Sequence, residues 1–181
     1  MLTGQPFALR MNAKLIALIA HWQESDDAKR KEVVEKSGLD FFRPHEVAEQ
    51  FHYFLQSNGI TEGMYEYKMT DNIHRINYKG KDVIAVSAKS RPIKVNVVGK
   101  NFGTFDKPFL ETHIPRWNSL VRFKQRIGDP TMLYTDFYND EEFPGLSECK
   151  KRAKLPEEVA HDAVEDAKDI VMLLRNKYGI K

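Results

Sequence analysis

The fold class depends on residues 93–110, which read IKVNVVGKNFGTFDKPFL. Residues 93–98 are rich in valine, and β-branched residues at this density favour a buried strand. A helix must start near Thr104, because a proline such as Pro108 is tolerated only in a first helical turn. Asp106 is then expected where the strand hands over to the helix, at the edge where ligands collect in open α/β sheets.

The rest of the chain continues this pattern. Before residue 93 we expect helices and one hairpin: helices from Asn12 to about Trp22, from Asp26 to Lys36 and from Pro44 to Asn58-Gly59, then strands Ile73–Tyr78 and Val83–Ser87 joined at Lys79-Gly80-Lys81. After it we expect a strand at Thr131–Tyr134 and a final helix at Ala163–Lys177. This alternation of strands and helices favours parallel pairing within an α/β sheet. We predict one domain over residues 1–181, mainly helical in 1–70, with a hairpin in 71–92 and an α/β part in 93–178.

The composition is that of an ordinary globular protein, with 41% hydrophobic and 30% charged residues among 181. The single cysteine, Cys149, excludes an internal disulfide and agrees with a reducing cytoplasm. The apolar run Leu15–Ala20 is too short for a membrane span, and its polar flanks do not suit a signal peptide. A cytoplasmic protein without a membrane partner is expected.

Charge is distributed unevenly along the chain, although the net charge is only +2. Residues 75–107 hold eight basic and two acidic side chains, whereas residues 136–169 hold eleven acidic and five basic ones. A basic middle beside an acidic end suits a protein that binds phosphates in one place and metal ions in another. Charge runs are nevertheless more often solvated surface.

Two aspartates are candidates for chemistry, and each has a structural alternative. Asp106 alone is explained by the preference of carboxylates for the first turn of a helix. Asp166 falls within the apolar arc of the last helix, whereas Glu165 and Asp169 lie on the opposite, polar side. A carboxylate on a core-facing stripe needs a partner or a metal unless it reaches water at the edge of the arc. The position of Asp166 on this helix is compatible with both a structural role and a metal-binding role.

His161 precedes this helix and can approach Asp166 only from the loop that enters it, because Asp162 is a good N-cap. An imidazole titrates near neutrality and can take a proton from an attacking water. Zinc is not expected, since one cysteine and scattered histidines give no ligand spacing.

Two motifs resemble those of the DEDDh family of 3′→5′ exonucleases. Asn101-x-x-x-Phe105-Asp106-x-x-Phe109-Leu110 resembles the family's second motif, and His161-x-Ala163-x-x-Asp166-Ala167 resembles the third. The resemblance covers residues 93–178 and implies a ribonuclease H-like fold. It also implies Asp106 and Asp166 as ligands of two Mg²⁺ or Mn²⁺ ions, with His161 as the general base.

The family's first motif, Asp-x-Glu on the opening strand, has no counterpart before Asp106. We therefore expect a truncated form that lacks the first strands of the fold, with a weakened two-metal site, and an upstream reading frame that encodes the motif. Asp140-x-Glu142 has the right spacing but lies in a turn-rich stretch, so we do not expect it to substitute. Strand 93–98 would then lack a neighbour, and either the hairpin or a second copy of the chain, forming a homodimer, would cover it.

The implied substrate is the 3′ end of single-stranded DNA or RNA. Lys100 and Asn101 are expected to contact it, and Phe105 can stack on a terminal base, although a core position for Phe105 is favoured. The function predicted first is a metal-dependent 3′→5′ exonuclease. The alternatives are a non-catalytic nucleic-acid-binding module with the same fold and a structural or protein-interaction domain.

Overall fold

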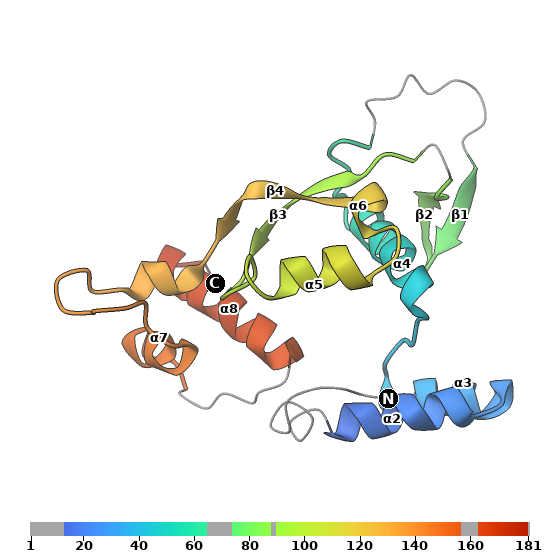
Figure 1. Cartoon of the computed structure of the whole chain (residues 1–181), viewed down its shortest axis with the longest axis horizontal. Helices are drawn as coiled ribbons and strands as arrows, with labels where there is room; N and C mark the ends of the chain where they lie inside the picture. The colour runs from blue at the N-terminus through green and yellow to red at the C-terminus, as the bar shows by residue number, and fades with distance from the viewer. Residues whose placement is uncertain (1–12, 65–73, 88–89, 157–162, 181) are drawn as a thin grey trace.

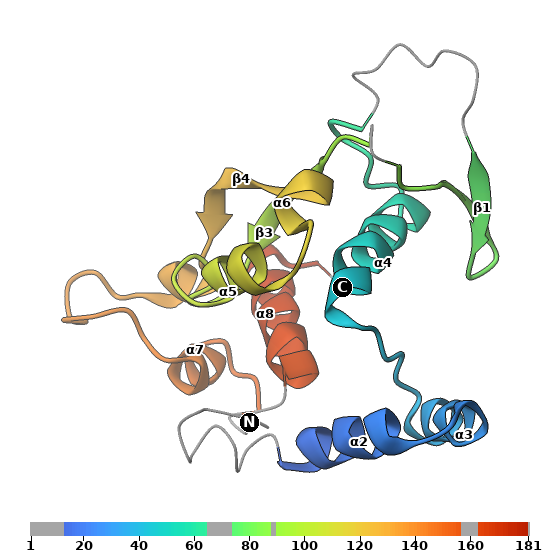
Figure 2. The same ribbon diagram turned by 45° about the vertical axis from the view of Figure 1, so that its right-hand side comes forward.

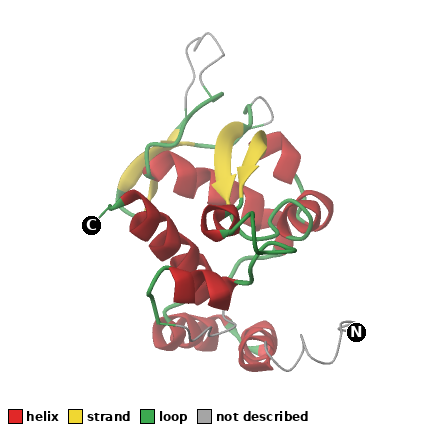
Figure 3. Cartoon of the chain, turned by 90° about the vertical axis from the view of Figure 1, so that its left-hand side faces the viewer, coloured by secondary structure: helices red, strands yellow, loops and turns green. Residues whose placement is uncertain are grey.

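The computed structural model describes residues 13–64, 74–87, 90–156 and 163–180. Its elements follow in chain order: α2 (Ala13–Glu24), α3 (Asp27–Ser37), α4 (Pro44–Ser57), β1 (Arg75–Tyr78), β2 (Lys81–Ile84), β3 (Ile93–Val98), α5 (Asp106–His113), α6 (Trp117–Leu120), β4 (Val121–Gly128), η1 (Pro130–Tyr134), α7 (Leu146–Arg152) and α8 (Ala163–Tyr178). Helices surround two small sheets (Figures 1 and 3). The predicted mixed α/β class is confirmed. No helix in the described ranges has the length and apolar character needed to cross a membrane.

The parallel pairing expected after residue 93 is present between β3 and β4. The chain crosses from one strand to the other through α5 and α6. The strand predicted at Thr131–Tyr134 is wrong, because these residues belong to the 3₁₀ helix η1. Asp129 caps η1 by accepting the Thr131 backbone N–H at 2.9 Å. Proline at position 130 suits a first helical turn and disfavours a ladder position, which explains the difference.

The predicted hairpin is confirmed, but its second strand begins at Lys81 and ends at Ile84 instead of running over Val83–Ser87, and residue 73 lies outside the described part. β1 and β2 pair antiparallel, and Lys79 and Gly80 turn the chain with φ of 47° and 83°. Two consecutive positive φ angles match the twist of the strands they join. Within the described residues this hairpin forms its own sheet and does not pair with β3, so of the two alternatives for covering that strand the hairpin is not the one observed, and a second copy of the chain stays a prediction. At the start of β3, the Lys94 backbone N–H instead donates to the Glu62 carbonyl at 2.7 Å.

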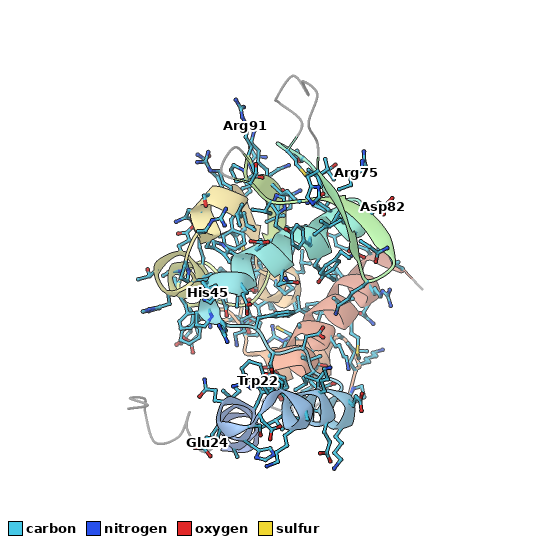
Figure 4. All side chains as sticks on the ribbon, turned by 90° about the vertical axis from the view of Figure 1, so that its right-hand side faces the viewer. Trp22, Glu24, His45, Arg75, Asp82 and Arg91 are labelled. Carbon is cyan, nitrogen blue, oxygen red and sulfur yellow. The ribbon has the colours of Figure 1, made fainter. Side chains whose placement is uncertain are left out.

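Of the helices before the hairpin, α3 and α4 follow their predicted start and stop residues, whereas α2 continues to Glu24, two residues past the expected end. Asp26 caps α3 by accepting the Lys29 backbone N–H at 2.9 Å, and Gly38 ends it with φ of 67°. Pro44 occupies the first turn of α4. The proposed cap Asn12 lies outside the described residues. Trp22, near the end of α2, lies at the opposite end of the molecule from the hairpin residues Arg75 and Asp82 (Figure 4).

The main core lies where α4 and α6 meet the β3–β4 pair. Its fully or almost fully buried residues are Ala48, Leu55, Ile93, Val95, Trp117, Leu120 and Val121. A second cluster joins α7 to α8 through Cys149, Ala153 and Leu173. The first cluster fixes the strand that leads to Asp106, and the second fixes the helix that carries Asp166.

A buried histidine makes the stability of this core depend on pH. His52 on α4 is almost fully buried, and burial lowers its pKa below the ordinary value of 6.5. Below pH 6.5 the unfolded chain therefore takes up a proton at this histidine more readily than the folded chain does. The free energy of unfolding is highest above that pH and falls as the pH drops. We expect the free energy of unfolding to decline as the pH falls below about 6.5. Urea denaturation across this range checks it. His52→Leu should flatten the slope, and the exposed control His45→Gln should keep it.

Candidate functional site

A cavity of about 1310 Å³ lies at the carboxyl end of β3. Four parts of the chain form its walls: the loop from β3 into α5, α5 itself, the start of α7, and one face of α8. α5 and α8 lie next to each other at this end of the strand in two views (Figures 1 and 2). Asp106 and Asp166, which are 60 positions apart in the sequence, therefore line the same cavity.

Both candidate aspartates line this cavity. Asp106 is the first residue of α5 and is exposed, whereas Asp166 lies in the first turn of α8 and is half-buried. The Oδ1 atom of Asp166 is buried and has no hydrogen-bond partner among the described residues. Leaving a buried carboxylate oxygen unpaired is unfavourable by several kcal/mol when no ligand compensates (roughly 1–3 kcal/mol even for a neutral group). The cavity therefore contains a buried acceptor to which no described residue donates.

The three residues predicted to contact substrate line the same cavity. Asn101 adopts φ of 57°, and its carbonyl accepts the backbone N–H groups of Thr104 and Phe105 at 3.1 and 3.0 Å. The left-handed residue that turns this loop is therefore Asn101 rather than a glycine. The Nζ atom of Lys100 lies 3.8 Å from where a β-carbon on Gly145 would sit, so it reaches across to the start of α7.

Phe105 is exposed, and the expectation that it belongs to the core is wrong. Its side chain is 74% exposed, and Phe109, one helical turn later, is 55% exposed. Both rings line the cavity. Phe109 also contacts the ring of His113, with a centroid distance of 5.0 Å. The exposed ring of Phe105 and the exposed part of Phe109 are therefore apolar surfaces on which a further ring can stack.

The third motif is described only in part. His161 lies outside the described residues, so its predicted approach to Asp166 stays a prediction. Within the described ranges, no group of three or more His, Cys, Asp or Glu side chains gathers closely enough to hold a metal ion. Asp140 and Glu142 do not line the cavity, and Asp140 instead forms an ion pair with Arg152. Among the residues that the structure describes, no second pair of carboxylates therefore takes the place of the first motif.

The basic stretch does not form one patch at the cavity. Lys79 forms an ion pair with Asp40, and Lys81 donates to the Ser57 carbonyl at 2.7 Å. Arg75 and Arg91 point outward at the hairpin end of the molecule (Figure 4). Among the described residues of the stretch, Lys100 is the basic side chain that lines the cavity.

The prediction that Asp169 lies on the polar, solvent-facing side of α8 is wrong. Asp169 was assigned to the polar face of α8, but it is buried and forms an ion pair of 2.8 Å with Lys150. The cause is α7, which was not predicted and which packs on α8. The only available indication was the pattern of Leu146, Cys149 and Ala153, at i, i+3 and i+7 after Gly145.

Comparison of the chain with protein-family models, with curated proteins and with solved structures finds no match.

Proposed function

We propose that the chain has a ribonuclease H-like fold and acts at the Asp106–Asp166 cavity as a metal-dependent 3′→5′ exonuclease on single-stranded DNA or RNA. One observation carries this proposal: the aspartates of two motifs, far apart in the sequence, line a single cavity, and the buried Oδ1 of Asp166 there has no hydrogen-bond partner among the described residues. The single buried Cys149 fits a cytoplasmic location.

The donor set fits Mg²⁺ or Mn²⁺, which prefer oxygen ligands. Such ions would be held by the exposed carboxylate of Asp106 and by Asp166, whose Oδ1 has no partner among the described residues. When bound, the ions would activate water and stabilise the leaving oxygen of a phosphodiester. With no Asp-x-Glu pair in the sequence before Asp106, two carboxylates bind metal weakly, and the reaction of this chain is slow.

The cavity walls fit a single-stranded end. The amine of Lys100 supplies one positive charge for a phosphate, and the exposed rings of Phe105 and Phe109 offer faces for a base. Stacking on an aromatic face does not distinguish sequences, so the substrate class is a strand end rather than a specific sequence.

The test is release of mononucleotides from single-stranded DNA and RNA oligonucleotides labelled at the 5′ end. With Mn²⁺ we expect slow stepwise shortening from the 3′ end, and none with a chelator. The same assay is made on any longer reading frame that contains this sequence, where an added Asp-x-Glu pair should raise the rate. Internal cleavage, or shortening that persists with the chelator, would contradict the proposal.

The alternative function is a non-catalytic nucleic-acid-binding module. Two observations favour it. The described residues of the cavity supply few carboxylates for a metal ion. Lys100, Phe105 and Phe109 could bind a strand without any metal. Binding of single strands that is independent of metal and falls with added salt, without release from any version of the chain, would select this alternative.

A further inference from the structure

The loop between η1 and α7 displays aromatic side chains to solvent. Phe137 is 69% exposed, Tyr138 is 99% exposed and Phe143 is 54% exposed. In Figure 1 this loop, in orange, projects from the body at the end away from the β1–β2 hairpin. We refer to residues 136–143 as the aromatic loop. None of them lines the Asp106–Asp166 cavity.

The loop backbone is held in place by hydrogen bonds that the carboxylates of its own aspartates accept. Asp136 accepts the Tyr138 backbone N–H at 3.0 Å and the Asn139 side-chain amide at 2.6 Å. In return, the Asp136 backbone N–H donates to Asp140 Oδ2 at 2.8 Å. The exposed rings therefore stand on a backbone that is already ordered.

Arg152 of α7 anchors the loop to the body. Its guanidinium donates to both carboxylate oxygens of Asp140, at 2.5 and 2.8 Å, and to the Tyr134 carbonyl at 2.8 Å. This contact, with the Asp136 N–H, lowers the pKa of Asp140 to about 2, so the carboxylate stays charged under all ordinary conditions. An ordered loop loses little conformational entropy on binding, which is the property of a preorganised docking surface.

The charge of the loop indicates the chemistry of its partner. Glu141 and Glu142 are exposed and form no hydrogen bond or ion pair with another described residue. Two uncompensated carboxylates beside the rings repel a phosphate backbone, which disfavours nucleic acid here. The same carboxylates attract lysine and arginine, while tyrosine and phenylalanine are favoured at the centre of protein interfaces.

We propose that the aromatic loop is a docking site for a protein partner whose surface offers an apolar pocket rimmed by lysine or arginine side chains. Phe137 and Tyr138 enter the pocket, and Glu141 and Glu142 pair with its rim. The site is separate from the proposed exonuclease cavity, so either proposal can fail without the other.

The test is selection of short random peptides, displayed on phage, against the whole chain. The selected peptides should combine apolar residues with lysine or arginine. Their binding should weaken at least about tenfold on the Phe137→Ala/Tyr138→Ala double variant, because ring truncation removes the central contacts. Phe54→Ala is the matched control, since Phe54 is 48% exposed on α4, and it should bind normally. Glu141→Gln/Glu142→Gln should weaken binding and remove its dependence on salt.

Three results would overturn the proposal. The first is no enrichment of peptides, or peptides that bind wild type and the double variant equally. The second is concentration-dependent dimerisation of the chain that the double variant abolishes, which would make a second copy the occupant. The third is binding of a single-stranded oligonucleotide that the double variant loses, which would make the loop a nucleic-acid contact.

Discussion

The substitution Asp166→Asn is expected to lower manganese-dependent release of mononucleotides by at least about two orders of magnitude. The substitution keeps the shape of the side chain and removes its charge. The affected oxygen is the buried one that has no hydrogen-bond partner in the described part of the chain. If it holds a cation, a neutral amide in its place loses most of that attraction.

Stability separates a functional role from a structural one. A buried, unpaired carboxylate is unfavourable for folding, so Asp166→Asn should leave the free energy of unfolding unchanged or raise it. Glu165→Gln is the matched control: its carboxylate is next in the chain, pairs with Lys168 at 2.6 Å and does not line the cavity. Release by this control should equal that of wild type. An Asp166→Asn protein that is less stable but equally active would show that the carboxylate serves the fold alone.

Binding of Mn²⁺ gives a readout that does not depend on turnover. Titration followed by electron paramagnetic resonance should show weak binding to wild type. Asp106→Asn and Asp166→Asn should each weaken it on the order of tenfold or more, since each removes one of few charged oxygen ligands. Glu165→Gln should not change it.

The elements predicted correctly are those whose ends carry strong local preferences. Asp26 and Gly38 fix the ends of α3 through a side-chain cap and a left-handed residue. Pro44 fixes the start of α4, and Lys79-Gly80 the turn of the hairpin. Each of these effects acts within a few residues, so the sequence around the position is sufficient.

The elements missed depend on packing partners that local sequence does not reveal. β4 carries Arg122, Lys124 and Arg126, and a register shift breaks its alternation opposite residues 95–97 of β3. The conformation of β4 therefore depends on its pairing with β3 and on the packing of Phe123 against the core. In the same way, burial of Asp169 follows from the position of α7, a contact between two helices that no periodicity within α8 can reveal.

The sequence selected residues that line one cavity, but it did not predict what surrounds them, and His161 lies outside the described residues. The motif resemblance selected Asp106 and Asp166, and the parallel crossover explains why Asp106 lies at the carboxyl end of β3. The exposure of Phe105 was missed, because an apolar residue at a helix start is equally compatible with a core and with a cavity wall. Only the position of α8 distinguishes them.

The substitution Lys150→Met is expected to lower the free energy of unfolding by about 3–5 kcal/mol, because it leaves the Asp169 carboxylate buried without the lysine that pairs with it. The Lys150 side chain is 4% exposed, and its Nζ lies 2.8 Å from Asp169 Oδ2. Urea denaturation followed by circular dichroism measures the loss. Lys151→Met is the control, since that neighbouring lysine is exposed, and it should change stability little.

A double variant tells whether the ion pair itself stabilises the contact between α7 and α8. Both charges lose water on folding, and their attraction only partly offsets this loss. Lys150→Met/Asp169→Leu replaces the pair with apolar groups beside the Cys149–Ala153–Leu173 cluster. Its free energy of unfolding should equal that of wild type or exceed it by up to about 4 kcal/mol, although each single variant is destabilised. A double variant as unstable as Lys150→Met would mean that the pair holds α8, and therefore Asp166, by a specific geometry that apolar packing cannot replace.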